Sequence, residues 1–121
     1  MLALKRKSWA QSVLATGTQT ASTNSPADTG YAGVDNLILQ LVVSAASGTT
    51  PTLDLVVQDS IDGATWNTIA TFTQATSTTN QVIRVAGPFG NAVRVASTIG
   101  AVATPSFTFI VTAQAESKGA N

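Results

Sequence analysis

Apolar and polar residues alternate with a period of two along most of this chain, and short turn-forming segments separate the alternating runs. The pattern is clearest at 36–44, NLILQLVVS, and at 53–59, LDLVVQD. One face of these two runs is apolar throughout: Leu37, Leu39, Leu41, Val43, Leu53, Leu55 and Val57. Such a period predicts half-buried β-strands rather than helices. The opposite face of 36–44 is also fairly apolar, which predicts a central strand.

Further runs extend the pattern towards the end of the chain. QVIRVA, NAVRVAST and SFTFIVTAQ lie at 81–86, 91–98 and 106–114. In ATWNTIATF, Trp66 and Phe72 share one register while Ile69 occupies the other, which predicts a β-bulge. Short strands with turns between them predict an all-β fold, a single antiparallel β-sandwich or jelly-roll of about seven to eight strands. The predicted core contains Leu39, Leu41, Leu55, Val57, Val95, Phe107 and Phe109.

The length of 121 residues suits one compact domain with its own core. We predict a β-sandwich domain at 16–115, an extended N-terminal arm at 1–15 with room for a short helix, and a flexible C-terminal tail at 116–121. The polar stretch 16–30 suits either a linker or an edge strand. The start of the chain lacks a signal peptide's continuous apolar stretch, and no segment approaches the roughly 18 apolar residues of a membrane span. We therefore expect no membrane partner.

Charged residues are scarce in this sequence. They make up 10% of the chain, against about 25% in ordinary soluble domains, while 44% is hydrophobic and the net charge is zero. Thr, Ser, Asn, Gln and Ala take the place of the missing charges. A neutral surface has no broad attraction for nucleic acid, so we expect no nucleic-acid partner. Uncharged polar side chains suit a surface that neighbouring subunits cover.

The chain contains neither histidine nor cysteine. Their absence removes imidazole bases, thiolate nucleophiles and nearly all zinc chemistry. No nucleophile motif stands out among the remaining residues. We therefore expect no catalytic residue, no cofactor and no metal site, and we interpret the protein as non-enzymatic.

The stretch DSIDGATW raises an alternative, because it brings Asp59 and Asp62 close together. Asp54 lies five residues before Asp59, about 16 Å away along an extended strand, and two carboxylates leave most of a calcium shell empty. A carboxylate pair for glycoside hydrolysis would need a cleft, which nothing in the sequence predicts. We interpret the stretch as a hairpin turn in which Gly63 supplies a positive φ after Asp62.

A second turn has the sequence GPFG. Pro88 presets its own φ, and Gly87 and Gly90 stand at its two ends, which predicts another hairpin. Arg84 and Arg94 bracket this turn. We interpret them as a solvated or subunit-bridging pair rather than a phosphate site, because two arginines make a thin phosphate site.

Two further features concern contacts with other molecules. The chain has two Trp, one Tyr and four Phe, and the core needs most of them, so we interpret Trp66 as core or interface filler rather than a platform for sugar. The N-terminal arm combines apolar anchors with a basic triplet. We predict that it binds a partner protein through Leu2, Leu4, Lys5, Arg6, Lys7 and Trp9.

The order of these motifs resembles that of small structural proteins of tailed bacteriophages. The motifs are STN…DTG, then LILQLVVSAASGTTPTLDLVVQDSIDGATW, then GPFGNAVRVASTIG…SFTFIVTA. Together they cover roughly residues 20–113, and they consist of turn and strand chemistry. Within that group the chain is most similar to jelly-roll capsid cement or decoration proteins.

The resemblance implies a non-enzymatic virion protein, made in the host cytoplasm, that binds major capsid protein at the capsid surface and stabilises the shell. It also implies a homo-oligomer, either a dimer or a trimer, and it transfers no site residues. A tail-associated virion β-sandwich is one alternative, because similar patterns occur there. A carbohydrate-binding module is another, and it would need exposed aromatic residues in a row or a polar concave face. A secreted bacterial adhesion domain is the third.

Overall fold

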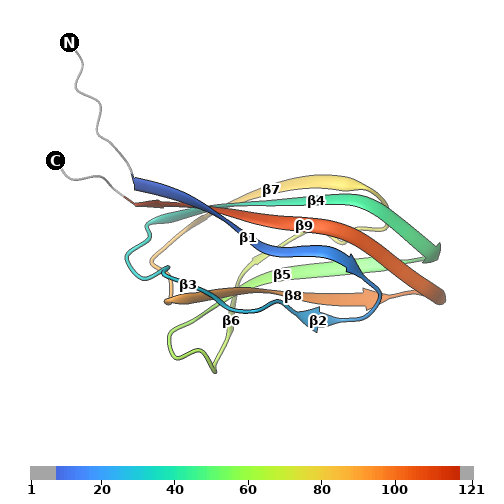
Figure 1. The fold of residues 1–121 in the computed structure, drawn as a ribbon, viewed down its shortest axis with the longest axis horizontal. Helices are drawn as coiled ribbons and strands as arrows, with labels where there is room; N and C mark the ends of the chain where they lie inside the picture. The colour runs from blue at the N-terminus through green and yellow to red at the C-terminus, as the bar shows by residue number, and fades with distance from the viewer. Residues whose placement is uncertain (1–7, 118–121) are drawn as a thin grey trace, which may run out of the picture.

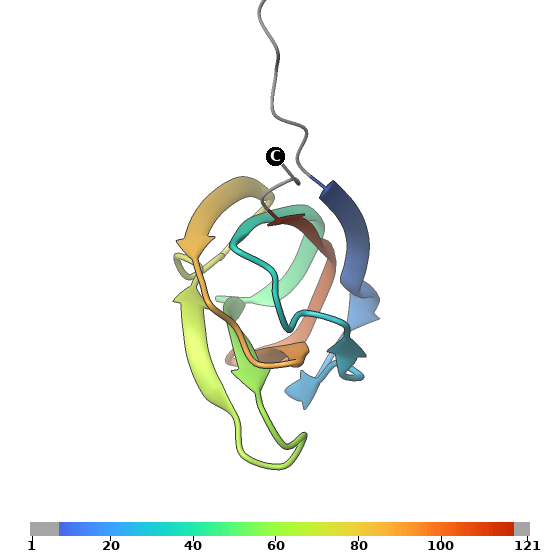
Figure 2. The same ribbon diagram turned by 90° about the vertical axis from the view of Figure 1, so that its left-hand side faces the viewer.

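The computed structural model describes residues 8–117, which form an all-β sandwich of two antiparallel sheets (Figures 1 and 2). Its strands are β1 (Ser8–Gln19), β2 (Thr23–Asn24), β3 (Asp28–Thr29), β4 (Asn36–Thr49), β5 (Thr52–Ser60), β6 (Asn67–Thr71), β7 (Thr79–Ala86), β8 (Ala92–Gly100) and β9 (Ala103–Ser117). The described residues contain no helix that is long and apolar enough to cross a membrane.

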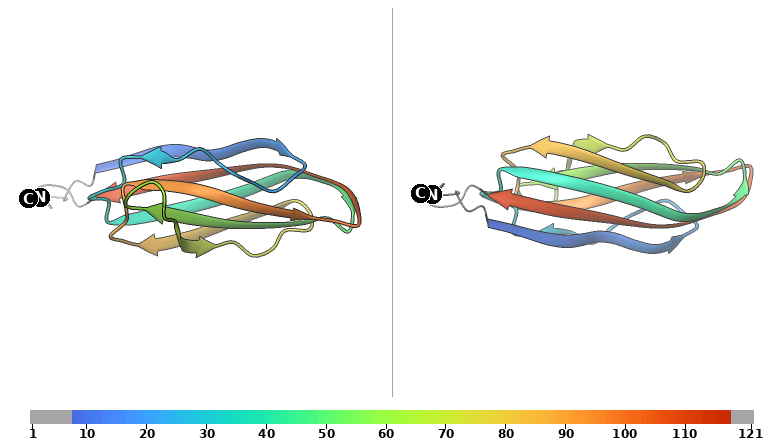
Figure 3. Two further views of the ribbon diagram at one scale, coloured as in Figure 1. Left: turned by 90° about the horizontal axis from the view of Figure 1, so that it is seen from below. Right: turned by 90° about the horizontal axis from the view of Figure 1, so that it is seen from above.

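The order of the strands is that of a jelly roll. One sheet has the order β1-β9-β4-β7, and the other has the order β2-β8-β5-β6, with β3 also paired to β8 (Figure 3). Apart from the β5–β6 hairpin and the short strands β2 and β3, consecutive strands lie in different sheets. Each sheet therefore takes strands from both halves of the chain, as the fold requires. The predicted fold class is confirmed.

The long strands β4 and β9 occupy the middle of the four-stranded sheet. Their pairing runs from Asn36 opposite Glu116 to Thr49 opposite Ala103. β4 also pairs with β7 on its other side, so the prediction of a central strand at 36–44 is confirmed. Buried and more exposed residues alternate along most of this strand because one face packs on the second sheet and the other faces outward.

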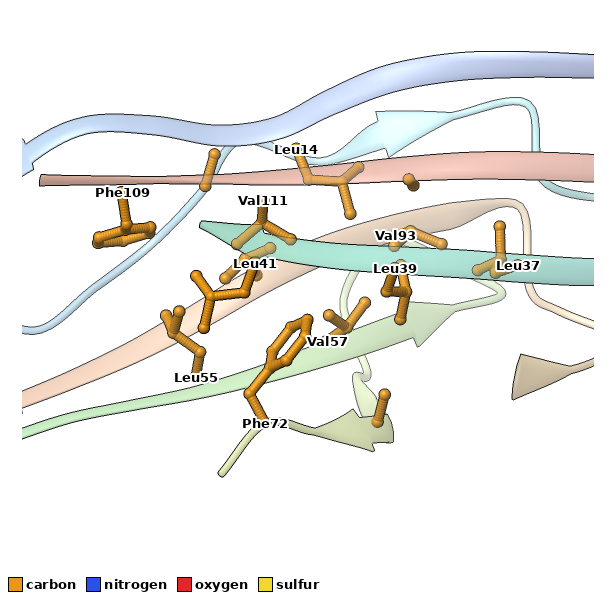
Figure 4. Packing of buried hydrophobic residues seen from close by; sticks show 14 of the residues in the cluster. Leu14, Leu37, Leu39, Leu41, Leu55, Val57, Phe72, Val93, Phe109 and Val111 are labelled. Carbon is orange, nitrogen blue, oxygen red and sulfur yellow. The ribbon is translucent and has the colours of Figure 1, made fainter. Parts of the chain in front are cut away.

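The hydrophobic core lies between the two sheets, and both contribute to it (Figure 4). Leu39 and Leu41 of β4 point from one side towards Leu55 and Val57 of β5 on the other. The residues that the sequence assigns to the core are at most 2% exposed: Leu39, Leu41, Leu55, Val57, Val95, Phe107 and Phe109. The period of two therefore identifies the inward face correctly.

The bulge predicted in the segment ATWNTIATF, residues 64–72, is present in β6. Val57 pairs with Ala70 and the next residue, Gln58, pairs with Thr68, so Ile69 is the extra residue. The insertion reverses the register within the strand. As a result Ala70 and Phe72 are buried on the core side, although the run did not alternate cleanly in the sequence.

The predicted N-terminal arm, residues 1–15, is wrong for its second half. Residues 8–15 belong to β1, which pairs with β9 from Ser8 opposite Ser117 onwards, so no helix forms there. A register shift between Val13 and Ala15 interrupts the period of two in this strand. Leu14 and Ala15 are both buried, and two consecutive inward residues break the period that marks a strand.

Two other predicted segments, 16–30 and 116–121, also differ from the structure. The stretch 16–30 is neither a plain linker nor one edge strand, because it holds the end of β1 together with β2 and β3. The predicted tail, 116–121, begins too early, since Glu116 and Ser117 still belong to β9 and pair with β1. Residues 118–121 of that tail lie outside the described part of the chain.

Phe109 gives a direct test of the core. It is 2% exposed, and we expect Phe109→Ala to lower the free energy of unfolding by about 3–5 kcal/mol because it removes a large enclosed ring. Urea unfolding measures this change. Val102→Ala is the control, because Val102 is 78% exposed and its truncation should change stability by less than about 0.5 kcal/mol. Equal effects of the two substitutions would contradict this assignment of the core.

Candidate contact surfaces

The acidic stretch after β5 forms a rigid loop, residues 61–66, that joins β5 to β6 and projects from the body (Figure 1). Oδ1 of Asp62 accepts hydrogen bonds from the backbone N–H of Ala64 at 2.9 Å and of Thr65 at 2.8 Å. The Ser60 hydroxyl also donates to it at 3.1 Å, while Ser60 Oγ accepts from Gly63 N–H at 2.8 Å. Gly63 has a φ of +77°, so its predicted role in a β5–β6 hairpin is confirmed.

The two carboxylates of this stretch hold different loops. Asp59 Oδ2 accepts a hydrogen bond from Gly90 N–H at 2.8 Å, whereas Asp62 binds amides of its own loop. Within residues 8–117, no group of three or more His, Cys, Asp or Glu residues is arranged to hold a metal ion. Both carboxylates therefore act as acceptors for backbone amides.

These amides change the acidity of Asp62. The hydrogen bond from Thr65 N–H is the largest cause, followed by those from Ala64 N–H and the Ser60 hydroxyl, and together they lower the pKa of Asp62 to about 2. Donors that face a carboxylate favour its charged form. The Asp62 side chain therefore stays a charged carboxylate down to strongly acidic pH.

The GPFG segment is not the predicted hairpin. β7 pairs with β4 and β8 pairs with β5, so Gly87, Pro88 and Gly90 belong to a connection that crosses from one sheet to the other. The Gly87–Pro88 peptide bond is cis. A Cβ on Gly90 would lie 2.5 Å from the carbonyl oxygen of Ser60, so the close approach of two backbones requires glycine there.

Arg84 and Arg94 consequently do not form the predicted pair. Arg84 lies in β7 of the four-stranded sheet, whereas Arg94 lies in β8 of the other. The Arg94 guanidinium carbon is 4.3 Å from the centroid of the Trp66 ring, and Arg94 Nε donates to Gln58 Oε1 at 2.9 Å. Of the two roles predicted for Trp66, core filler or interface filler, the core role is wrong, because Trp66 is half-buried beneath this arginine rather than enclosed in the core.

Most of the outward side of the four-stranded sheet is uncharged. One row of residues across it consists of Val13, Thr112, Gln40 and Val82, taken from β1, β9, β4 and β7 in that order. We call the following set the neutral face: Gln11, Val13, Thr18, Ile38, Gln40, Val42, Val82, Thr108, Ile110, Thr112 and Gln114. The alternation of burial along the strands places these residues away from the core.

Polar side chains on the neutral face bond to one another. Thr18 Oγ1 and Thr108 Oγ1 are 2.8 Å apart, and Gln11 Nε2 donates to Gln114 Oε1 at 3.4 Å. Between Gln11 and the adjacent strands lies a shallow depression of about 220 Å³, which Arg84 borders. Apolar side chains stand among these polar groups, with Val13 55% and Val82 48% exposed. The face therefore combines an uncharged polar surface with exposed apolar groups.

The structure places one member of the predicted partner-binding set. Trp9 lies in β1 at the end of the neutral face, opposite Glu116 of β9, and is 63% exposed. The other five residues fall outside the described part of the chain: Leu2, Leu4, Lys5, Arg6 and Lys7. Sequence reasoning missed the neutral face itself. Its signal was the alternating Gln, Thr and Val residues on the non-core side of the predicted strands.

Comparison with known proteins shows a shared fold. No protein-family model matches the chain, and no curated protein sequence matches it. Among solved structures, the PBSX exported protein XepA matches with a TM-score of 0.60 and 13% identity, over 93% of this chain and 38% of that one. The SPBc2 prophage-derived protein YomS matches with a TM-score of 0.58 and 8% identity, over 97% of this chain and 100% of that one.

A viral capsid protein shares the fold as well. VP2 of the infectious bursal disease virus subviral particle matches with a TM-score of 0.60 and 14% identity, over 94% of this chain and 33% of that one. The chain thus spans the whole of YomS but well under half of XepA and VP2. At such identities the likeness is one of fold: a jelly-roll β-sandwich similar to phage-derived and viral proteins.

The backbone at Gly63 provides a test of the loop. Gly63→Val should lower the free energy of unfolding by about 1–2 kcal/mol because a β-branched residue adopts a positive φ with strain. No atom lies within 4 Å of the position of an added Cβ, so the cost is conformational rather than a clash. Ala64→Val introduces the same side chain one residue later and should cost less than about 0.5 kcal/mol. A urea titration that gives equal losses would contradict the loop geometry.

The lowered pKa of Asp62 makes the stability of the loop depend on pH. The folded value is about 2, below the ordinary value of about 3.9, so the carboxylate stabilises the fold fully above about pH 4 and loses this effect as the pH falls towards 2. Asp62→Asn keeps an acceptor oxygen but lacks the charge. The urea midpoint of wild type should exceed that of the variant at pH 5, and the gap should close by pH 2. A gap that stays constant would rule out this linkage.

Proposed function

We propose that this chain is a non-enzymatic structural protein of a phage virion. In this proposal it binds major capsid protein at the capsid surface and stabilises the shell by bridging neighbouring subunits. The neutral face is the observation that best supports the proposal. It presents polar and apolar side chains over four strands, and the fold beneath it is one that phage-derived and viral proteins share.

The size of the neutral face suits a protein partner. Four strands spaced by about 4.8 Å and about ten residues at about 3.3 Å rise give a flat area on the order of 600 Å². A standard protein interface buries about 800 Å² on each partner. The charged residues that the described part of this sheet side carries are Arg84 and Glu116, both towards one end. Covering the face therefore removes few charges from water, which keeps the desolvation cost low.

The acidic residues support a structural rather than a catalytic role. Asp59 and Asp62 each accept hydrogen bonds from backbone amides, and Asp54 accepts two from Gln74 Nε2 at 3.1 Å. Catalysis by a carboxylate pair would need both groups to face one substrate cleft. In this chain the three side chains instead stabilise separate loops. We therefore propose that partners bind the outer faces of the sandwich rather than a catalytic cleft.

The arrangement of aromatic residues does not favour a carbohydrate-binding module. Five of the seven aromatic side chains are buried: Tyr31, Phe72, Phe89, Phe107 and Phe109. The two tryptophans belong to different sheets, because Trp9 lies in β1 and Trp66 directly precedes β6. They cannot form the row of exposed rings against which a sugar chain would stack. A contact surface for protein remains the better proposal.

The proposal includes a second attachment through the start of the chain. Residues 1–7 are separated by Ser8 alone from Trp9, the exposed aromatic residue at the end of the neutral face. Their apolar residues and basic triplet would give the chain a second contact with a partner, which raises the effective concentration of the first. A homodimer or homotrimer would multiply such contacts further.

The first test mixes purified protein with capsid shells that lack it and measures the temperature at which the shells rupture. Full-length protein should raise this temperature, and deletion of residues 1–7 should reduce the rise. The deletion ends at Lys7 because a longer one, to residue 15, would remove most of β1 and uncover the edge of β9. Binding of the protein without residues 1–7 should weaken only modestly with added salt, because the neutral face carries few charges.

Two outcomes of this experiment count against parts of the proposal. Undiminished binding by the truncated protein would contradict only the role given to residues 1–7. Failure to bind any shell, or binding confined to a glycan array, would contradict the virion role and favour the carbohydrate-binding module.

A matched pair of substitutions tests the neutral face. Gln40→Lys places a charge in the middle of the face, whereas Ser77→Lys places the same charge on the exposed loop between β6 and β7, away from the neutral face. A buried, unpaired charge at an interface costs several kcal/mol. We therefore expect Gln40→Lys to weaken binding to shells at least about 30-fold and Ser77→Lys to weaken it by less than about threefold. Equal affinities of the two variants would exclude the neutral face as the contact.

A further inference from the structure

Arg94 is held in one position on the outward side of the five-stranded sheet. Its guanidinium carbon lies 4.3 Å from the centroid of the Trp66 ring, and its Nε donates to Gln58 Oε1 at 2.9 Å. Gln58 is the residue opposite Arg94 in the β5–β8 ladder, so the register fixes this contact. We call these three residues the arginine site.

The terminal nitrogens of Arg94 have no acceptor in the described part of the chain. Within residues 8–117 the guanidinium makes no ion pair, and its polar partner is the Gln58 side chain, which Nε contacts. The nearby carboxylates are engaged elsewhere, because Asp59 accepts from Gly90 N–H and Asp62 from Ala64 and Thr65 N–H. A cation with unused donors therefore stands on this side of the sandwich.

Stacking and hydrogen bonding prepare this arginine for binding. An arginine normally loses considerable rotamer entropy when a partner immobilises it, but Trp66 and Gln58 have already restricted Arg94. Its planar fork presents two parallel N–H donors, a geometry that matches both oxygens of a carboxylate. Arginine and tryptophan are also the residue types that contribute most to binding at protein interfaces.

We propose that the arginine site binds the carboxylate of an acidic side chain on a partner protein. This inference rests on the proposed function and assigns a second contact to it. The site lies on the opposite side of the sandwich from the neutral face, since β8 and β4 belong to different sheets. One copy of the chain can therefore contact two neighbouring capsid subunits at once, which is what bridging requires.

The surroundings favour a protein over an acidic glycan as the source of the carboxylate. Arg94 covers one face of the Trp66 ring, which leaves less of the ring for a sugar to stack on. The same loop carries Ile61, which is 90% exposed and stands on the backbone that Asp62 holds rigid. An exposed aliphatic side chain on the loop that also carries Trp66 suits a protein surface, because sugars are recognised mainly by polar groups and aromatic rings.

The test measures the affinity of the full chain for shells that lack it. Arg94→Gln should weaken binding about 10- to 30-fold, because it removes the fork and its charge. Arg94→Lys should recover less than half of that loss on a logarithmic scale, since lysine keeps the charge but not the planar fork. Lys118→Gln, at a residue outside the described part of the chain, also removes one positive charge and should change the affinity less than about twofold.

The shells themselves provide the second half of the test. Converting their surface carboxylates to neutral amides, with a carbodiimide and an amine, should weaken wild-type binding to about the level of Arg94→Gln. The same treatment should weaken Arg94→Gln by less than about threefold, because the two changes remove one interaction. Thermal unfolding of each variant confirms that the sandwich is intact.

Each outcome decides between the inference and the function on which it rests. If wild type fails to bind shells, the proposed function and the inference both fail. If wild type binds and Arg94→Gln binds equally well, or if amidation weakens both proteins alike, the arginine site is not the contact while the proposed function stands. Binding to an acidic oligosaccharide that Arg94→Gln abolishes, with no loss on shells, would assign the site to a glycan instead.

Discussion

The packing of two apolar sheet faces is the constraint on which the rest of the structure depends. Leu39 and Leu41 from β4 meet Leu55 and Val57 from β5 in a core in which these side chains are almost fully enclosed. Because side chains alternate along a strand, committing one face to this core leaves every other residue free of it. The outward residues can therefore be chosen for contact with other molecules, and in this chain they are mostly uncharged.

The jelly-roll topology turns those outward residues into two separate surfaces. The neutral face extends over β1, β9, β4 and β7, while Arg94 and Trp66 stand on the other sheet. Two contact surfaces on opposite sides of a small rigid body suit a protein that joins larger ones. The loop at 61–66 and the crossing at 87–91 lie at the same end of the sandwich. Asp59, near the end of β5 and just before this loop, links the two by accepting a hydrogen bond from Gly90 N–H.

The sequence predicts the positions of the strands and their inward faces better than it predicts which strands pair with each other. The period of two identifies the strands at 36–44 and 53–59. It does not identify β1, because a bulge at Leu14 places two buried residues in succession. Periodicity also says nothing about which strands pair, so the sequence of the GPFG crossing predicts a hairpin that the structure does not contain. The stack of Arg94 on Trp66 depends on that pairing, and it could not be predicted without the β5–β8 register.

A cryo-electron microscopy reconstruction of shells saturated with the protein tests the central claim most directly. We expect density for the sandwich between neighbouring capsid subunits, with the β1-β9-β4-β7 sheet against one subunit and the side that carries Arg94 towards the next. Shells that remain bare under saturating protein, or virions in which the sandwich is found on the tail alone, would contradict it.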